Sequence, residues 1–174
     1  MNPESQELSD RRPLRLAGSV GQPNAFRAGQ GEQSPLPSLA AVRPRLPVVV
    51  LPQIPAWEAA YWAAWEAVWS GLRNPPANSP LTGPVFVNER GSPSQMDHSA
   101  IVARLAGYVA PDFDLIHLLD NFYGAQLDDG YIPRDLDIHS GQSCFPAYDP
   151  NSTGPDLLAW AEWRHFRLTG DDTR

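Results

Sequence analysis

Four stretches of the chain carry apolar residues at the spacing of a helix. In residues 55–72 they recur every three or four positions, as one stripe. The stripe consists of Trp57, Tyr61, Trp65, Val68, Trp69 and Leu72. Pro55 suits the first turn of a helix, and Gly71 is followed by Pro75, which ends it. We expect a helix whose stripe packs into the core, whereas Trp62, off the stripe, is a candidate for stacking on a sugar ring.

Three further helices are predicted downstream. The first runs from about Asp97 to Val109, the second begins at Pro111, and the third covers the sequence LLAWAEWRHFRLTG and ends at Gly170. In the first of these helices one face carries Ile101, Leu105 and Tyr108. In the second, one face carries Phe113, Ile116, Leu119, Asp120 and Tyr123. In the third helix we expect Trp160 and Trp163 to lie in the core. Consecutive helices joined by loops of medium length pack as antiparallel hairpins.

The remaining segments do not show helical periodicity. Residues 1–45 are rich in Pro, Gly, Gln, Ser and Arg, and such a segment buries too little apolar surface to offset its ordering entropy, so it is predicted to be a disordered tail. Residues 46–55, LPVVVLPQIP, form either an edge strand or an extended segment along the first helix. No strand pairing is evident. We predict an all-α fold with one domain over residues 46–174.

Charge is unevenly distributed along the 174 residues. Residues 1–54 hold six arginines and four acids, a net +2, and because the whole chain carries −7, residues 55–174 carry −9. An acidic domain disfavours nucleic acid as a partner, since phosphate binding needs clustered Lys and Arg. The chain has no lysine, which we interpret as a bias of composition and not as a functional signal.

Cysteine and histidine content argues against a metal or another cofactor. Cys144 is the single cysteine, which excludes an intrachain disulfide, and the four histidines lack the spacing of a metal site. No apolar run is long enough to span a bilayer, so we predict no membrane contact. The first residues, MNPESQELSDRRPLR, lack the apolar core of a secretory signal, and we expect a cytoplasmic location.

The stretch between residues 111 and 172 combines carboxylates, amides, an arginine and aromatic rings near predicted helix ends. These groups suit a polyhydroxylated ligand, because hydroxyls bind Asp, Asn, Gln and Arg while the C–H faces of a sugar contact aromatic rings. Aspartates are also frequent in turns and at helix starts, where they act as caps. Arg134 either fixes Asp135 or Asp149, or binds substrate hydroxyls, or is a surface residue.

Several short sequence blocks follow one another in an order that is typical of one enzyme family. They are Asn88-Glu89, Met96-Asp97, Leu119 to Tyr123, Gln126, Asp129 to Ile132, Arg134-Asp135 and Asp149 to Pro155. In this order, from about Leu46 to Arg174, the chain resembles the opening part of glycoside hydrolases of the (α/α)6-barrel group. The closest resemblance is to the mannosylglycerate hydrolase-like branch of family sixty-three, which is related to trehalase.

The resemblance implies part of an (α/α)6 barrel and a carbohydrate ligand, with action on glucosyl or mannosyl glycosides. It assigns substrate binding to Asp97, Asn121, Gln126, Arg134 and Asp149. It assigns no catalytic residue, because the acid and base of the family lie beyond the matching part, so we expect a truncated barrel that is inactive alone. Met96 replaces a tryptophan of the family's sugar site. The alternative is a non-enzymatic helical module that binds a sugar or a protein; the sequence predicts neither the sugar nor the oligomeric state.

Overall fold

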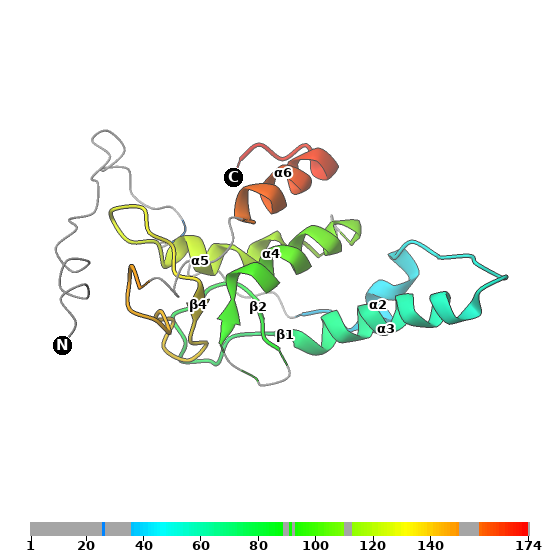
Figure 1. Ribbon diagram of the computed structural model, residues 1–174, viewed down its shortest axis with the longest axis horizontal. Helices are drawn as coiled ribbons and strands as arrows, with labels where there is room; N and C mark the ends of the chain where they lie inside the picture. Colours follow the sequence, from blue (N-terminus) through cyan, green and yellow to red (C-terminus); the bar gives the residue numbers. More distant parts are fainter. Residues whose placement is uncertain are drawn as a thin grey trace, which may run out of the picture.

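A computed structural model describes residues 26, 36–88, 91, 93–109, 113–149 and 157–173 of the chain. Its body is built around α4 (Met96–Leu105), which continues into the 3-10 turn η3 (Ala106–Tyr108). α6 (Leu158–Thr169) packs across α4, and the 3-10 helix η4 (Leu115–Leu118) packs against both and leads into α5 (Asp120–Gly124). Figure 1 shows α6 above α4, with α5 at the end of the body from which α4 starts.

The core lies where these helices meet. Its buried side chains include Leu115, Ile116, Leu118, Leu119 and Phe122 from the segment that spans η4 and α5, together with Ala100, Val102 and Ala103 from α4. The face of α4 and η3 that carries Ile101, Leu105 and Tyr108 is exposed instead. The small residues of α4 allow η4 and α6 to approach it closely, so the larger aliphatic side chains of this helix remain on the outside.

Two short antiparallel sheets tie the loops to the body. β1 (Leu72–Arg73) pairs with β2 (Val85–Phe86), and β3 (Ser94–Gln95) pairs with β4 (Asp135–Leu136). Single bridges join Val87 to Ser94 and Leu136 to Ser143, so the backbone pairing runs on from one sheet to the next. The pairing of β3 with β4 brings the start of α4 beside residues 134–136, which lie far along the chain.

The predicted all-α fold of helical hairpins in an incomplete (α/α)6 barrel is wrong. The structure is mixed, with helices and two small antiparallel sheets. Each strand has only two residues, which is too short for an apolar–polar alternation to show in the sequence. The predicted helix from Pro111 is also replaced: Asp114 caps η4 through Ile116 N (3.0 Å), and α5 ends at Gly124. Residues 110–112 lie outside the described part.

The predicted first helix is confirmed as α3 (Pro55–Gly71), which forms an arm beside α2 (Leu39–Val42). Figure 1 shows this arm extending away from the body. Trp65 is buried and Trp69 Nε1 donates to Pro37 O (2.9 Å), as expected for the stripe. Trp57 is 63% exposed, so its predicted core position is wrong. The ring borders an open groove with Val49 and Leu51, and the described part of the chain leaves most of it uncovered.

Ordered structure begins before the predicted boundary at residue 45. The sequence predicts disorder through this position, whereas the structure has α2 and the 3-10 turn η2 (Arg43–Arg45) here. Ser38 caps α2, and Val42 is buried against the arm. Residues 1–25 and 27–35 lie outside the described part. For residues 46–54 the extended-segment alternative is confirmed, since they lie along α3 and Tyr61 Oη donates to Pro47 O (2.6 Å).

The last predicted helix is confirmed as α6, but its orientation differs from the expectation. Its buried residues are Leu158, Ala161 and His165, whereas Trp160 and Trp163 are 40% and 58% exposed. The predicted core positions of both tryptophans are therefore wrong. Arg104 of α4 lies 3.6 Å from the centre of the Trp160 ring, a cation–π contact that covers part of it. None of the described helices has the length and apolar content needed to cross a membrane.

Candidate functional site

The start of α4 and the residues before β4 form the centre of the candidate site. Met96 N donates to Arg134 O (2.8 Å), and Gln95 pairs with Asp135 across the two strands. This register brings Asp97, in the first turn of α4, close enough to Arg134 for its charge to act on the guanidinium. Two of the predicted site residues therefore meet at one place, although 37 positions separate them in the sequence.

Arg134 is held in one orientation by two neighbours. Its Nε and Nη2 donate to the two oxygens of Asp135, at 3.2 and 3.0 Å, and its guanidinium lies 4.4 Å from the centre of the Phe145 ring. The Asp135 side chain is 3% exposed and that of Arg134 is 27% exposed. The hydrogen bonds to Asp135, with smaller contributions from Asp97 and Tyr131, raise the pKa of Arg134, so it remains charged. Of the alternatives for Arg134, the pairing with Asp135 is confirmed.

A pair of tyrosines adjoins the arginine. The rings of Tyr131 and Tyr148 lie 4.9 Å apart, and Tyr148 Oη donates to Asp129 Oδ2. Tyr148 has a φ of 65°, a conformation that bulky residues adopt rarely and at a cost of about 1–3 kcal/mol. Tyr148 is 51% exposed, so this backbone conformation presents a ring to solvent beside a fixed carboxylate.

These side chains together are called the arginine–tyrosine face. It consists of Asp97, Asp129, Tyr131, Arg134, Asp135, Phe145 and Tyr148. Its components are a fixed cation, carboxylates and partly exposed rings. Chemically, the face can donate and accept hydrogen bonds while it offers an apolar surface to a ring-shaped ligand.

Gln126 and Asp149 lie in the loops that border this face. Gln126 Nε2 donates to Gly130 O (3.0 Å), which closes the turn before Tyr131, and Asp149 follows Tyr148 directly. The sugar-binding roles assigned to Asp97, Gln126, Arg134 and Asp149 stay predictions. The structure adds that Asp97 and Arg134 are neighbours, whereas Gln126 and Asp149 belong to the adjoining loops.

Asn121 has a structural environment instead. Its Oδ1 accepts from Thr82 N (3.0 Å) and Gly83 N (3.2 Å), and its Nδ2 donates to Gly83 O and Pro84 O (3.3 and 2.9 Å). The side chain is buried and fastens the 82–84 loop to α5. A predicted role in ligand binding would therefore compete with four hydrogen bonds that hold the fold.

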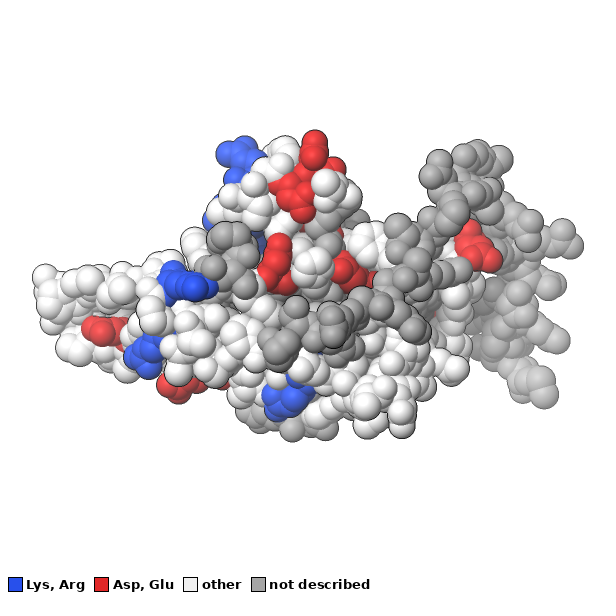
Figure 2. All heavy atoms as spheres, turned by 180° about the vertical axis from the view of Figure 1, so that it is seen from behind, with Lys and Arg blue, Asp and Glu red and all other residues white. Residues whose placement is uncertain are grey.

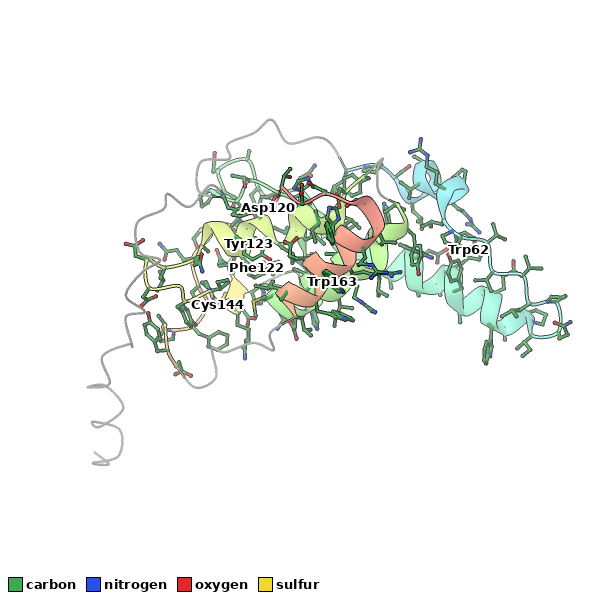
Figure 3. All side chains as sticks on the ribbon, turned by 90° about the horizontal axis from the view of Figure 1, so that it is seen from above. Trp62, Asp120, Phe122, Tyr123, Cys144 and Trp163 are labelled. Carbon is green, nitrogen blue, oxygen red and sulfur yellow. The ribbon has the colours of Figure 1, made fainter. Side chains whose placement is uncertain are left out.

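A cavity of about 230 Å³ lies next to Asn121. It is lined by Phe26, Pro80, Leu81, Thr82, Asp120, Asn121, Gly124, Ala125 and Gly141. The Asp120 carboxylate on its wall also meets His117 Nδ1 at 2.7 Å, one helical turn away. Figure 3 shows Asp120, Phe122 and Tyr123 on α5 and Cys144 beside the β4 strand. With mixed polar and apolar walls, this cavity has room for a small molecule only.

Cys144 is exposed but is a poor nucleophile in this setting. Desolvation, with the negative charges of Asp135 and Asp137, raises the pKa of its thiol, which favours the unreactive protonated form. Asp137 accepts hydrogen bonds from the backbone and hydroxyl of Ser140, which lower the pKa of its carboxyl. Within the described residues, no three His, Cys, Asp or Glu side chains converge as metal ligands would.

The chain was compared with known proteins at the level of families, curated sequences and solved structures. No family model, no curated protein and no solved structure matches it. The family resemblance therefore rests on the sequence blocks alone.

Tyr148 and Phe145 are the members of the face that the sequence did not indicate. Both lie in the irregular segment between residues 135 and 150, which has no periodicity to orient a side chain. The one feature of the sequence that could have indicated Tyr148 is its position directly before Asp149. This is a weak signal unless the contact with Tyr131 is known. The partner of Arg134 was one of two alternatives, because both carboxylates lie in loops near it.

Proposed function

We propose that this protein binds a carbohydrate at the arginine–tyrosine face, in the manner of a glycoside hydrolase-like protein, without hydrolysing it. The observation that carries the proposal is Arg134, fixed by Asp135 and Phe145 beside the partly exposed Tyr131–Tyr148 pair. A guanidinium in one orientation donates to sugar hydroxyls at little entropic cost, because it is already ordered. The adjoining rings cover the apolar face of a pyranose.

The sequence blocks support the same assignment. The Met96-Asp97 block and the Arg134-Asp135 block are among those shared in order with the glycosidase family, and the structure has them side by side through the Met96–Arg134 hydrogen bond. The proposed ligands are glucosyl or mannosyl glycosides. A cytoplasmic location belongs to the same proposal.

The geometry of the carboxylates argues against hydrolysis at this face. Inverting glycosidases use two carboxyl groups roughly 6.5–9.5 Å apart, one of which delivers a proton while the other activates water. Asp135 is buried and bound to Arg134, and Asp129 is bound to Tyr148, so both carboxylates already have partners within the fold. We therefore propose binding without turnover for this chain.

The test is a titration of the protein with methyl α-D-mannopyranoside and methyl α-D-glucopyranoside, followed by the intensity of NMR signals or by calorimetry. Replacing Tyr148 with Ala should weaken binding by roughly tenfold, since stacking on an aromatic ring contributes about 1–1.5 kcal/mol. Tyr108→Ala is the matched control, because Tyr108 is exposed to the same degree (50%, against 51% for Tyr148) but lies in η3, outside the face.

Two results would count against the proposal. One is the absence of saturable binding of either glycoside up to about 100 mM, well above the millimolar dissociation constants typical of weak contacts. The other is equal weakening by Tyr148→Ala and Tyr108→Ala, which would show that ring removal acts nonspecifically. Release of methanol from either glycoside would contradict the proposed lack of catalysis, and not the binding site.

A further inference from the structure

The extended segment before α3 has the features of a strand without a partner. Leu46 is buried and Pro47 O accepts from Tyr61 Oη, so the start of the segment is fixed to the arm. Leu51 O accepts from Ile54 N (2.9 Å), so the end of the segment closes in a turn directly before α3. Between these ends lie Val48–Val50, here called the valine strand. The arm holds the valine strand in place, but in the part of the chain that the structure describes, the backbone of the arm makes no hydrogen bonds to the backbone of this strand.

The valine strand alternates as an edge strand does. Val48 and Val50 are 73% and 74% exposed, whereas Val49 is half-buried against the arm. Within the described residues, no backbone hydrogen bond engages the N–H or C=O groups of these three residues. Pro47 and Pro52 delimit the strand, and three consecutive β-branched residues favour the extended conformation.

The surroundings of the strand are apolar and uncharged. Ile54 and Trp57 are 43% and 63% exposed, and a shallow groove lies between the strand and α3. Residues 46–57 contain no charged side chain, and Figure 2 shows this part of the arm, at the left of that view, as largely white. An uncovered patch of this kind is a protein-interaction surface or an aggregation hazard.

We propose that the valine strand pairs antiparallel with the valine strand of a second copy of this chain, about a two-fold axis at Val49. The unpaired backbone groups require a strand as the partner, because neither a helix nor lipid can satisfy a row of N–H and C=O groups. Antiparallel pairing about Val49 sets Val48 of each copy opposite Val50 of the other. The strand is therefore its own complement, as an isologous two-fold contact demands.

Charge also favours a second copy meeting at this strand. Residues 55–174 carry a net −9, so two copies repel one another when the acidic bodies approach. The arm holds the valine strand away from the body (Figure 1), which allows the uncharged tips to meet with the bodies apart. The same negative charge disfavours an anionic lipid surface as the occupant.

The size of the patch predicts a weak dimer. A standard interface buries about 800 Å² on each partner, and three strand residues with Ile54 and Trp57 offer less than that. We therefore expect a dissociation constant in the micromolar range or weaker. Such a dimer forms and separates with protein concentration.

The proposal is tested with two double variants at the exposed valines, measured by sedimentation equilibrium from micromolar to about millimolar protein. Val48→Glu/Val50→Glu sets like charges opposite each other and should weaken the dimer by about tenfold or more. Val48→Glu/Val50→Lys sets opposite charges across the two-fold axis and should dimerise at least tenfold more tightly than the first variant. Trp163→Glu, on α6, should leave the dimer unchanged.

Hydrogen exchange gives a second readout of the same contact. The amides of the valine strand should become more protected as protein concentration rises, whereas those of α4 should not. A wild-type chain that stays monomeric at about millimolar concentration overturns the proposal. So does equal weakening by both double variants, which would indicate nonspecific apolar association, or weakening by Trp163→Glu, which would place the contact on α6.

Discussion

At the scale of single residues, the most consequential side chain is Asn121. Its amide group makes four hydrogen bonds to the 82–84 loop from a buried position, so both ends of the amide are used. An unpaired amide buried among aromatic residues would be costly. Here the partners of the amide are backbone groups of the fold.

We predict that Asn121→Ala destabilises the protein by about 2–4 kcal/mol, because it leaves the half-buried Thr82 and Gly83 N–H groups without their partner. Urea unfolding followed by tryptophan fluorescence measures this. Asn78→Ala is the control, since Asn78 is exposed in a turn, and it should change stability by about 0.5 kcal/mol or less. If both variants unfold at the same urea concentration, the structural role assigned to Asn121 is wrong.

At the scale of elements, the turn after β4 couples stability to pH. Asp137 Oδ1 accepts from His139 N, Ser140 N and Ser140 Oγ, and these bonds lower the pKa of Asp137 below its ordinary value of 3.8. The native state therefore binds this proton less readily than the unfolded chain does. The stabilisation is complete above the unfolded pKa and is lost as the pH falls through the lower folded pKa.

The expected result is a pH-dependent difference between the wild type and Asp137→Asn. The wild type should have the larger free energy of unfolding near neutral pH, and this advantage should shrink below about pH 4. Ser140→Ala removes the hydroxyl donor to Asp137. In this background, Asp137 should still stabilise the protein relative to Asn at this position, but by less than in the wild type. Denaturant unfolding at a series of pH values measures it; an advantage that grows on acidification would contradict the assignment.

The elements differ in how far the sequence determines them. α3 and α6 were predictable because their apolar spacing, the first-turn Pro55 and the left-handed Gly170 (φ 74°) are local signals. The two-residue strands were not, since pairing between β3 and β4 is decided by tertiary contacts and leaves no periodicity. The same holds for the site: Arg134 was found from its chemistry, but Tyr148 becomes visible only through its contact with Tyr131.

At the scale of the whole molecule, the core is unequally shared between the body and the arm. The fully buried large side chains, such as Phe122 and Leu119, belong to the body. Along α3 only Trp65 and Gly71 are buried, and the helix packs chiefly on α2. Regions with few buried apolar contacts open at lower free energy than the core, so we expect the arm to unfold locally while the body remains folded.

The arm depends on Trp65, which contacts Tyr61 and Trp69 with ring centres 6.3 and 5.9 Å apart. Removing a buried tryptophan costs about 3–5 kcal/mol. In Trp65→Ala we therefore expect amide exchange in residues 55–70 to accelerate by at least about tenfold, with less than about twofold change in η4 and α5. Phe122→Ala, in the body core, should instead accelerate exchange in both regions, because the arm joins the body through β1 and β2. Hydrogen exchange with mass spectrometry distinguishes acceleration in the arm alone from acceleration in both the arm and the body. Equal acceleration in the arm and the body of Trp65→Ala would show that the molecule opens as one cooperative unit and that the arm has no stability of its own.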